Sequence, residues 1–109
     1  MVRVDILQVF HISAVQETLP LPSKIEVKFD RKTRDTGNVY IEYESRNKAS
    51  GIRTTQADYW AYFIGDEEVY VVSVEKLKEK IAKLNPKRIP GGDNNTSMGF
   101  LIKLEELIK

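Results

Sequence analysis

The chain has 109 residues, of which 41% are hydrophobic and 30% charged, and its formal net charge is +1. This size and composition are typical of one soluble globular domain, residues 1–109. No apolar run approaches the roughly 20 residues of a membrane span. The absence of cysteine excludes disulfides and thiolate metal sites, and the single histidine, His11, excludes a histidine-rich zinc cluster. We therefore expect a cytoplasmic protein whose metal site, if it has one, is built from oxygen ligands, as Mg2+ and Mn2+ prefer.

Three strands are predicted in the N-terminal half of the chain. Val2–Phe10 and Ile25–Phe29 are rich in β-branched and apolar residues, and Val39–Glu44 alternates apolar and polar side chains. The sequence Leu19–Pro22 indicates an irregular connection, because proline lacks the donor that a sheet requires. Asp35–Asn38 is a turn signal. We expect the three strands to form an antiparallel meander.

The C-terminal half predicts further helices and strands. Thr54 and Thr55 are suitable caps for a short helix over Gln56–Tyr62, whose far end could already be strand. The remaining predicted elements are a strand over Glu68–Ser73, a helix over Val74–Leu84, a mobile loop over Lys87–Ser97, a short strand over Phe100–Lys103 and a last helical turn over Leu104–Ile108. The expected fold is α/β, a mixed sheet with a β-β-β-α-β core flanked by helices.

The predicted strand Ile25–Phe29 divides its side chains between two faces. Its apolar residues point one way, and Glu26, Lys28 and the following Asp30 point the other way. A carboxylate can hold Mg2+, and an ammonium group nearby can assist the attacking water or stabilise charge on a phosphate. A second carboxylate is needed, and Asp5 is the best candidate if a meander places its strand alongside. The alternative is an amphipathic strand whose charged face is simply solvated.

Basic residues follow this strand directly. Arg31, Lys32 and Arg34 lie between Asp30 and the turn signal. Such a cluster beside a carboxylate site fits contacts to phosphates, although the same segment also fits an ordinary polar turn. Further along the chain, Glu42 is expected to be exposed, and the less favoured alternative places it near the site. The aromatic residues Tyr59, Trp60, Tyr62 and Phe63 are expected to be core residues.

The acid on one strand and the E-x-K pattern on the next, here Asp5 and Glu26-Val27-Lys28, resemble the PD-(D/E)XK nuclease superfamily. That superfamily includes restriction enzymes and Holliday-junction resolvases. The resemblance covers Val2 to Leu84 and implies a restriction-endonuclease-like fold, here without the usual first helix. It implies an endonuclease that needs Mg2+ or Mn2+ and hydrolyses DNA, including junction or branched DNA. The implied roles are metal binding by Asp5 and Glu26, catalysis by these two with Lys28, and support from Gln56 and Asp30.

Two further expectations concern partners. A chain of this size offers little surface to grip a duplex, so a homodimer acting on DNA is expected, and its symmetry would place one site on each strand. The alternative function is a non-catalytic module on the same fold that binds nucleic acid or protein. A requirement for metal ions distinguishes the two, because an enzyme needs them for turnover and a binding module does not.

Overall fold

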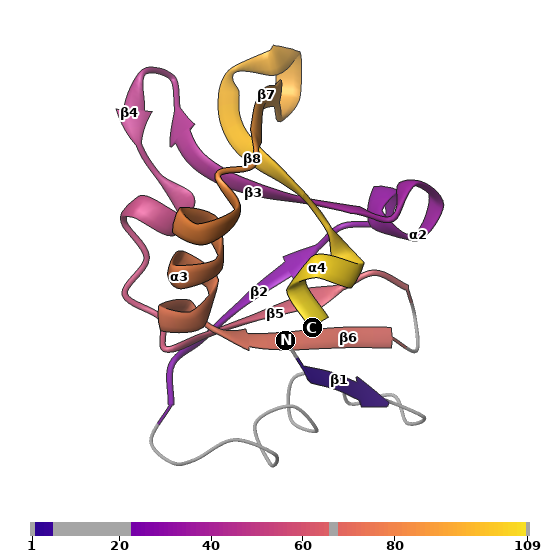
Figure 1. The fold of residues 1–109 in the computed structure, drawn as a ribbon. Helices are drawn as coiled ribbons and strands as arrows, with labels where there is room; N and C mark the ends of the chain where they lie inside the picture. The colour runs from indigo at the N-terminus through magenta and orange to yellow at the C-terminus, as the bar shows by residue number, and fades with distance from the viewer. Residues whose placement is uncertain (1, 6–22, 66–67, 109) are drawn as a thin grey trace.

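Two four-stranded sheets and three helices build the described part of the chain, residues 2–5, 23–65 and 68–108 of a computed structural model (Figure 1). The mixed sheet has the order β1 (Val2–Asp5), β6 (Glu68–Ser73), β5 (Tyr59–Phe63) and β2 (Ile25–Phe29). The antiparallel sheet has the order β4 (Lys48–Ala49), β3 (Asn38–Ser45), β8 (Ser97–Lys103) and β7 (Lys87–Gly91). The helices are α2 (Lys32–Thr36), α3 (Val74–Leu84) and α4 (Leu104–Ile108), and short 3₁₀ turns cover Gly51–Arg53 and Asp93–Asn95. None of the helices described here has the length and apolar character needed to cross a membrane.

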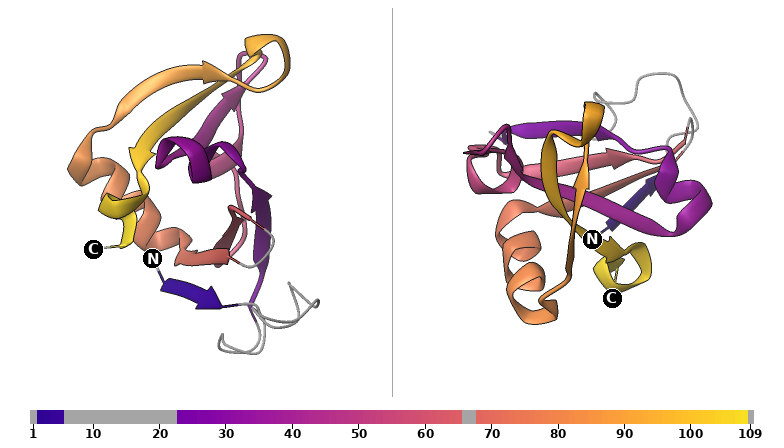
Figure 2. Two further views of the ribbon diagram at one scale, coloured as in Figure 1. Left: turned by 90° about the vertical axis from the view of Figure 1, so that its right-hand side faces the viewer. Right: turned by 90° about the horizontal axis from the view of Figure 1, so that it is seen from above.

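The main core lies where the inner face of the mixed sheet meets the antiparallel sheet and two helices. Trp60 and Tyr62 of β5, Leu77 of α3 and Leu107 of α4 are all at most 2% exposed and belong to one apolar cluster. The antiparallel sheet contributes buried residues from β3 and β8 to the same cluster. Figure 2 shows the antiparallel sheet rising from one end of the mixed sheet, with both helices beside it. The expected α/β class with a mixed sheet is therefore confirmed.

The expected meander of the first three strands is wrong. β1 and β2 are both edge strands of the mixed sheet, and β6 and β5 lie between them. β2 pairs with β5 in parallel, whereas β3 belongs to the other sheet. Local sequence determines that a segment is a strand, but the pairing of strands depends on contacts that are distant in sequence.

The helix expected over Gln56–Tyr62 is also wrong, because the chain forms strand β5 there. Trp60 and Tyr62 face the main core, while Ala61 and Phe63 belong to a second apolar cluster on the outer face of the same sheet. A strand that is buried on both faces shows no polar alternation, so its sequence resembles a buried helix. The core assignment holds for three of the four aromatic residues, since Tyr59 is only half-buried.

Two segments expected to be irregular contain regular structure. The basic segment after β2 forms α2, which ends at Gly37 in the left-handed conformation that glycine favours, with φ of 75°. The segment expected as a loop over Lys87–Ser97 includes β7, which pairs with β8. By contrast, β6 and α3 have the predicted bounds. The α3 helix starts where the Ser73 side chain accepts a hydrogen bond from the Lys76 N–H (3.1 Å).

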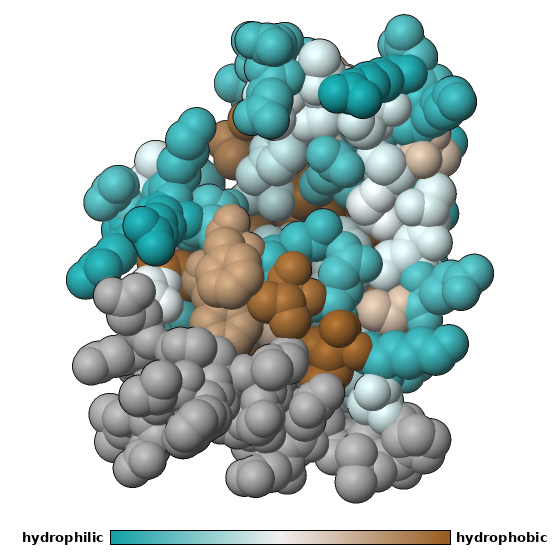
Figure 3. Space-filling view, turned by 180° about the vertical axis from the view of Figure 1, so that it is seen from behind, coloured by the Kyte–Doolittle hydropathy of each residue, from teal (hydrophilic) through white to brown (hydrophobic). Residues whose placement is uncertain are grey.

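The outer face of the mixed sheet is apolar along β2. The ring of Phe29 is 75% exposed and stacks on Phe63, with 5.2 Å between the ring centroids. Ile25 and Val27 are half-buried and pack against the second apolar cluster. Figure 3 shows apolar side chains gathered on the back of the molecule. An apolar flank of this kind is what the expected homodimer would use, and the homodimer stays a prediction.

Candidate functional site

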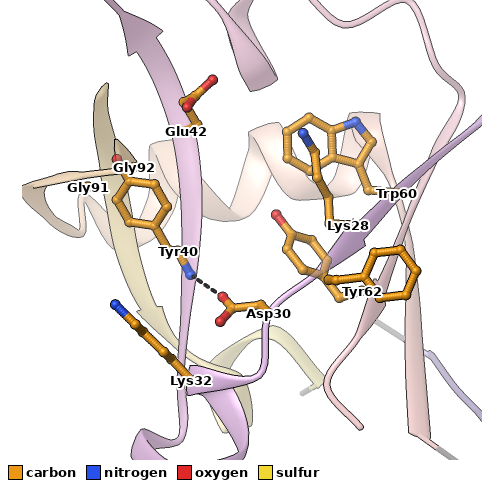
Figure 4. Close-up of a pocket in the computed structure, with 10 residues that line it drawn as sticks. Lys28, Asp30, Lys32, Tyr40, Glu42, Trp60, Tyr62, Gly91 and Gly92 are labelled. Atoms are coloured by element: carbon orange, nitrogen blue, oxygen red, sulfur yellow. Dashed lines mark hydrogen bonds between the residues drawn. The ribbon is translucent and has the colours of Figure 1, made fainter. Parts of the chain in front are cut away.

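A cleft of about 300 Å³ opens between the two sheets (Figure 4). Strands β2 and β5 provide one wall, and β3 provides the other. The polar residues that line the cleft are Lys28, Asp30, Lys32, Tyr40, Glu42 and Tyr62. The division of β2 into two faces is as expected, because Glu26 and Lys28 lie level with the inward-facing Trp60 and Tyr62. The charged face of β2 therefore borders a cleft instead of a flat solvated surface.

Glu26 and Lys28 form a closed network with the neighbouring strand. The Lys28 ammonium lies 2.7 Å from Glu26 Oε2 and 5.1 Å from the centre of the Trp60 ring. The Thr55 hydroxyl donates to Glu26 Oε1 (2.9 Å) and accepts from the indole N–H of Trp60 (3.2 Å). Both carboxylate oxygens of Glu26 are thus engaged within the protein. The network holds the Lys28 ammonium in a fixed direction over an aromatic ring.

Asp30 connects the two walls of the cleft. One of its oxygens accepts from the Thr33 N–H of α2 and the other from the Tyr40 N–H of β3, each at 3.3 Å. Its own N–H donates to the Phe63 carbonyl (2.9 Å). Asp30 therefore fixes the start of α2 and the position of β3 relative to β2. A carboxylate has about four lone-pair sites, so these bonds leave acceptor capacity directed to the cleft.

Glu42 and Tyr40 bring β3 to the cleft. They are two residues apart on one strand and so share a face. The Ser50 hydroxyl donates to Glu42 Oε2 (3.0 Å), and the Tyr40 hydroxyl is 2.8 Å from Ser97 Oγ. Glu42 was expected to be exposed, but it is half-buried and lines the cleft. A carboxylate from β3 and one from the end of β2 thus border the same space.

Tyr62 lies at the floor of the cleft. Its side chain is 2% exposed, and its hydroxyl has no hydrogen-bond partner among the described residues. Burial raises the pKa of this hydroxyl well above 10, and the negative charges of Asp30 and Glu26 raise it further. The hydroxyl is therefore a protonated donor at neutral pH. Sequence reasoning treated Tyr62 only as a core residue, although its place opposite Lys28 on the neighbouring strand follows once the two strands are paired.

The structure separates the remaining candidate residues. Asp5 lies on β1, three inter-strand spacings from β2, or about 14 Å. It is level with Glu68 of β6, whereas Glu26 is level with Val72, so the backbone does not bring Asp5 and Glu26 together as a pair. Gln56 is exposed, and it is the neighbouring Thr55 that contacts Glu26.

The three basic residues after β2 are exposed on and beside α2. Lys32 lines the cleft, and Arg34 lies beside Gly65. Arg31 precedes the first helical residue. Of the three basic residues, only Lys32 lines the cleft.

The raised pKa of Tyr62 predicts a loss of stability in alkali. Below about pH 10 the phenol is neutral in both states. As the pH rises further, the unfolded chain releases this proton while the folded chain retains it, so the free energy of unfolding falls. Tyr62→Phe should reduce this alkaline loss. Urea denaturation between about pH 8 and pH 11 gives the free energy of unfolding of both proteins. If this free energy falls equally with pH in the wild type and in Tyr62→Phe, the prediction is wrong.

The donor set of the cleft suits a hard cation. In the described residues, no three His, Cys, Asp or Glu side chains gather as a metal site. Mg2+, however, is usually held by one or two carboxylates together with water and substrate phosphates. Asp30 and Glu42 are the two carboxylates that line the cleft. Comparison with protein families, with curated proteins and with solved structures found no match, so function has to be inferred from the chain's own residues.

Proposed function

We propose that this chain is a metal-dependent endonuclease that hydrolyses DNA phosphodiester bonds in the cleft between its two sheets. The observation that carries the proposal is that two carboxylates and two lysines line one cleft. Asp30 and Lys28 come from the β2 side, Glu42 comes from β3, and Lys32 comes from α2. Hydrolysis of a phosphodiester needs carboxylates for the metal and cations for the phosphate, and both kinds of group are present.

Asp30 and Glu42 are the residues we assign to the metal, Mg2+ or Mn2+. The metal-ligating atoms of both side chains are carboxylate oxygens, which hard divalent cations prefer. Both side chains are held by other groups, Asp30 by two backbone N–H groups and Glu42 by the Ser50 hydroxyl. Hydrogen bonds of this kind orient ligating carboxylates. When bound, the metal would activate water and polarise the phosphate.

Lys28 is assigned to the phosphate. Its ammonium is held by Glu26 and by the face of Trp60, so its direction is fixed before a substrate arrives. A preorganised cation lowers the cost of charge that develops on the phosphate oxygens. Lys32 at the rim, with Arg31 and Arg34 exposed nearby, would contact the DNA backbone on either side of the cleaved bond.

Cleavage assays with defined DNA test the proposal. The protein should nick or cut DNA in Mg2+ or Mn2+ and lose this activity in EDTA. Linear duplex, supercoiled plasmid and a four-way junction, compared at equal concentration, show whether branched DNA is preferred. Calorimetry should detect Mn2+ binding without DNA. Salt-sensitive DNA binding with no cleavage in either metal would instead favour the binding module, and the absence of both would remove both proposals.

A further inference from the structure

The Tyr62 hydroxyl is a buried polar group that no described residue uses as a hydrogen-bond partner. Its ring belongs to the main core, and in the strand register Tyr62 is level with Lys28 of β2 and Tyr70 of β6. The hydroxyl has no hydrogen-bond partner among the described residues. Burying a hydroxyl without a partner costs stability, and a phenylalanine would fill the same space without that cost. The group therefore calls for an acceptor other than the described residues.

The direction of the hydroxyl identifies where that acceptor would be. Figure 4 shows the oxygen pointing away from the core into the space between β2 and β3, between Lys28 and Asp30. Thr33 Oγ1 is also buried and unpaired in the described part of the chain, but Thr33 does not line the cleft. Tyr62 thus differs from a simple packing defect, because its orphaned donor is aimed at the candidate site.

The chemistry of the surroundings selects the kind of acceptor. A protonated phenol donates one hydrogen bond, and the Lys28 ammonium lies on the same wall of the cleft. Asp30 already accepts two backbone N–H groups. A donor beside an ammonium group is suited to an anionic oxygen, and hydrogen bonds to charged acceptors are the stronger kind.

We propose that the Tyr62 hydroxyl donates a hydrogen bond to a non-bridging oxygen of the phosphate that occupies the cleft. Tyr62 is thereby a residue that contacts the DNA backbone at the reacting phosphate. This inference rests on the proposed function, because it takes the phosphate of DNA as the ligand. It also gives a role to a hydroxyl at a position where the core itself favours an apolar ring.

Tyr62→Phe tests the inference, with Tyr59→Phe as the matched control. Tyr59 lies on the same strand but packs against the second apolar cluster on the outer face. Tyr62→Phe should leave the melting temperature unchanged or raise it, because no bond within the protein is lost. It should weaken binding of a fluorescent DNA duplex in Ca2+ by about tenfold or more and lower kcat/KM for cleavage in Mg2+. Tyr59→Phe should match the wild type in binding and cleavage.

The outcomes separate this inference from the proposed function. If the wild type binds and cleaves DNA and Tyr62→Phe does so equally well, the hydroxyl has no role and the inference is wrong, while the proposed function stands. A lowered melting temperature for Tyr62→Phe, with binding lost in proportion to unfolded protein, would also overturn it. If the wild type neither binds nor cleaves DNA in any metal, the proposed function fails, and the phosphate contact fails with it.

Discussion

Glu42→Gln should lower the rate of DNA cleavage by more than about 100-fold, while Glu26→Gln should retain most of it. Glutamine keeps the size of Glu42 and can still accept from the Ser50 hydroxyl, so the fold should be unaffected. What is lost is the negative charge that the metal requires. Mn2+ affinity, measured by calorimetry, should fall together with the cleavage rate.

Glu26→Gln is the informative comparison because the sequence pattern assigns the metal to Glu26. In the structure both of its oxygens are occupied, one by Lys28 and one by Thr55. The pair is about one third exposed, and such pairs contribute about 1 kcal/mol or less to stability. We therefore expect intact Mn2+ binding and a modest loss of cleavage, since Lys28 loses its fixed direction. If Glu26→Gln loses Mn2+ binding while Glu42→Gln still binds Mn2+, the metal ligand is Glu26 of the E-x-K motif and not Glu42.

The elements that sequence predicted correctly are those whose signals are local. The α3 helix has its serine cap, buried Val74 and Leu77 at helical spacing, and a left-handed Asn85 at its end. β5 was predicted as helix because two threonines resemble a cap and because both of its faces are buried. The Thr55 hydroxyl is in fact used by Glu26, Trp60 and the Ala57 N–H. Local propensity could not show that use, because Glu26 is distant in sequence.

The candidate site followed from sequence only along one strand. Strand alternation places Lys28 and Asp30 together, and the structure confirms that they share a face. The position of the opposite wall, which β3 provides, depends on where the antiparallel sheet crosses the end of β2. That position is fixed by the contact between the Tyr40 N–H and Asp30 and by the pairing of β3 with β8. The sequence therefore favours an exposed Glu42 over one near the site, and it pairs the Asp5 strand with β2, whereas β1 and β2 are opposite edges of the sheet.

Gly99→Ala should destabilise the protein by about 2–3 kcal/mol, near the upper end of the cost of overpacking a core. Gly99 is buried on β8, and the Tyr40 ring covers it. A Cβ on Gly99 would overlap that ring and lie 2.9 Å from the Ile41 carbonyl oxygen, closer than real Cβ atoms approach. A Cβ placed on Gly91 of β7 would overlap the same ring, so the ring packs closely over both glycines. Urea denaturation measures the loss, which is a large part of the 5–15 kcal/mol typical of such a domain.

A double-mutant cycle shows whether the Tyr40 ring is the cause of this cost. Tyr40→Ala alone removes the hydrogen bond to Ser97 and the cover over the glycines, so it should also destabilise the protein. With the ring removed, Gly99→Ala should cost less, and the double variant should be more stable than the sum of the two losses predicts. Gly65→Ala is the control, because its nearest neighbour would be the Arg34 side chain at an ordinary 3.5 Å, and it should change stability by less than about 0.5 kcal/mol. Strict additivity of the Tyr40 and Gly99 changes would place the strain in the β8 backbone.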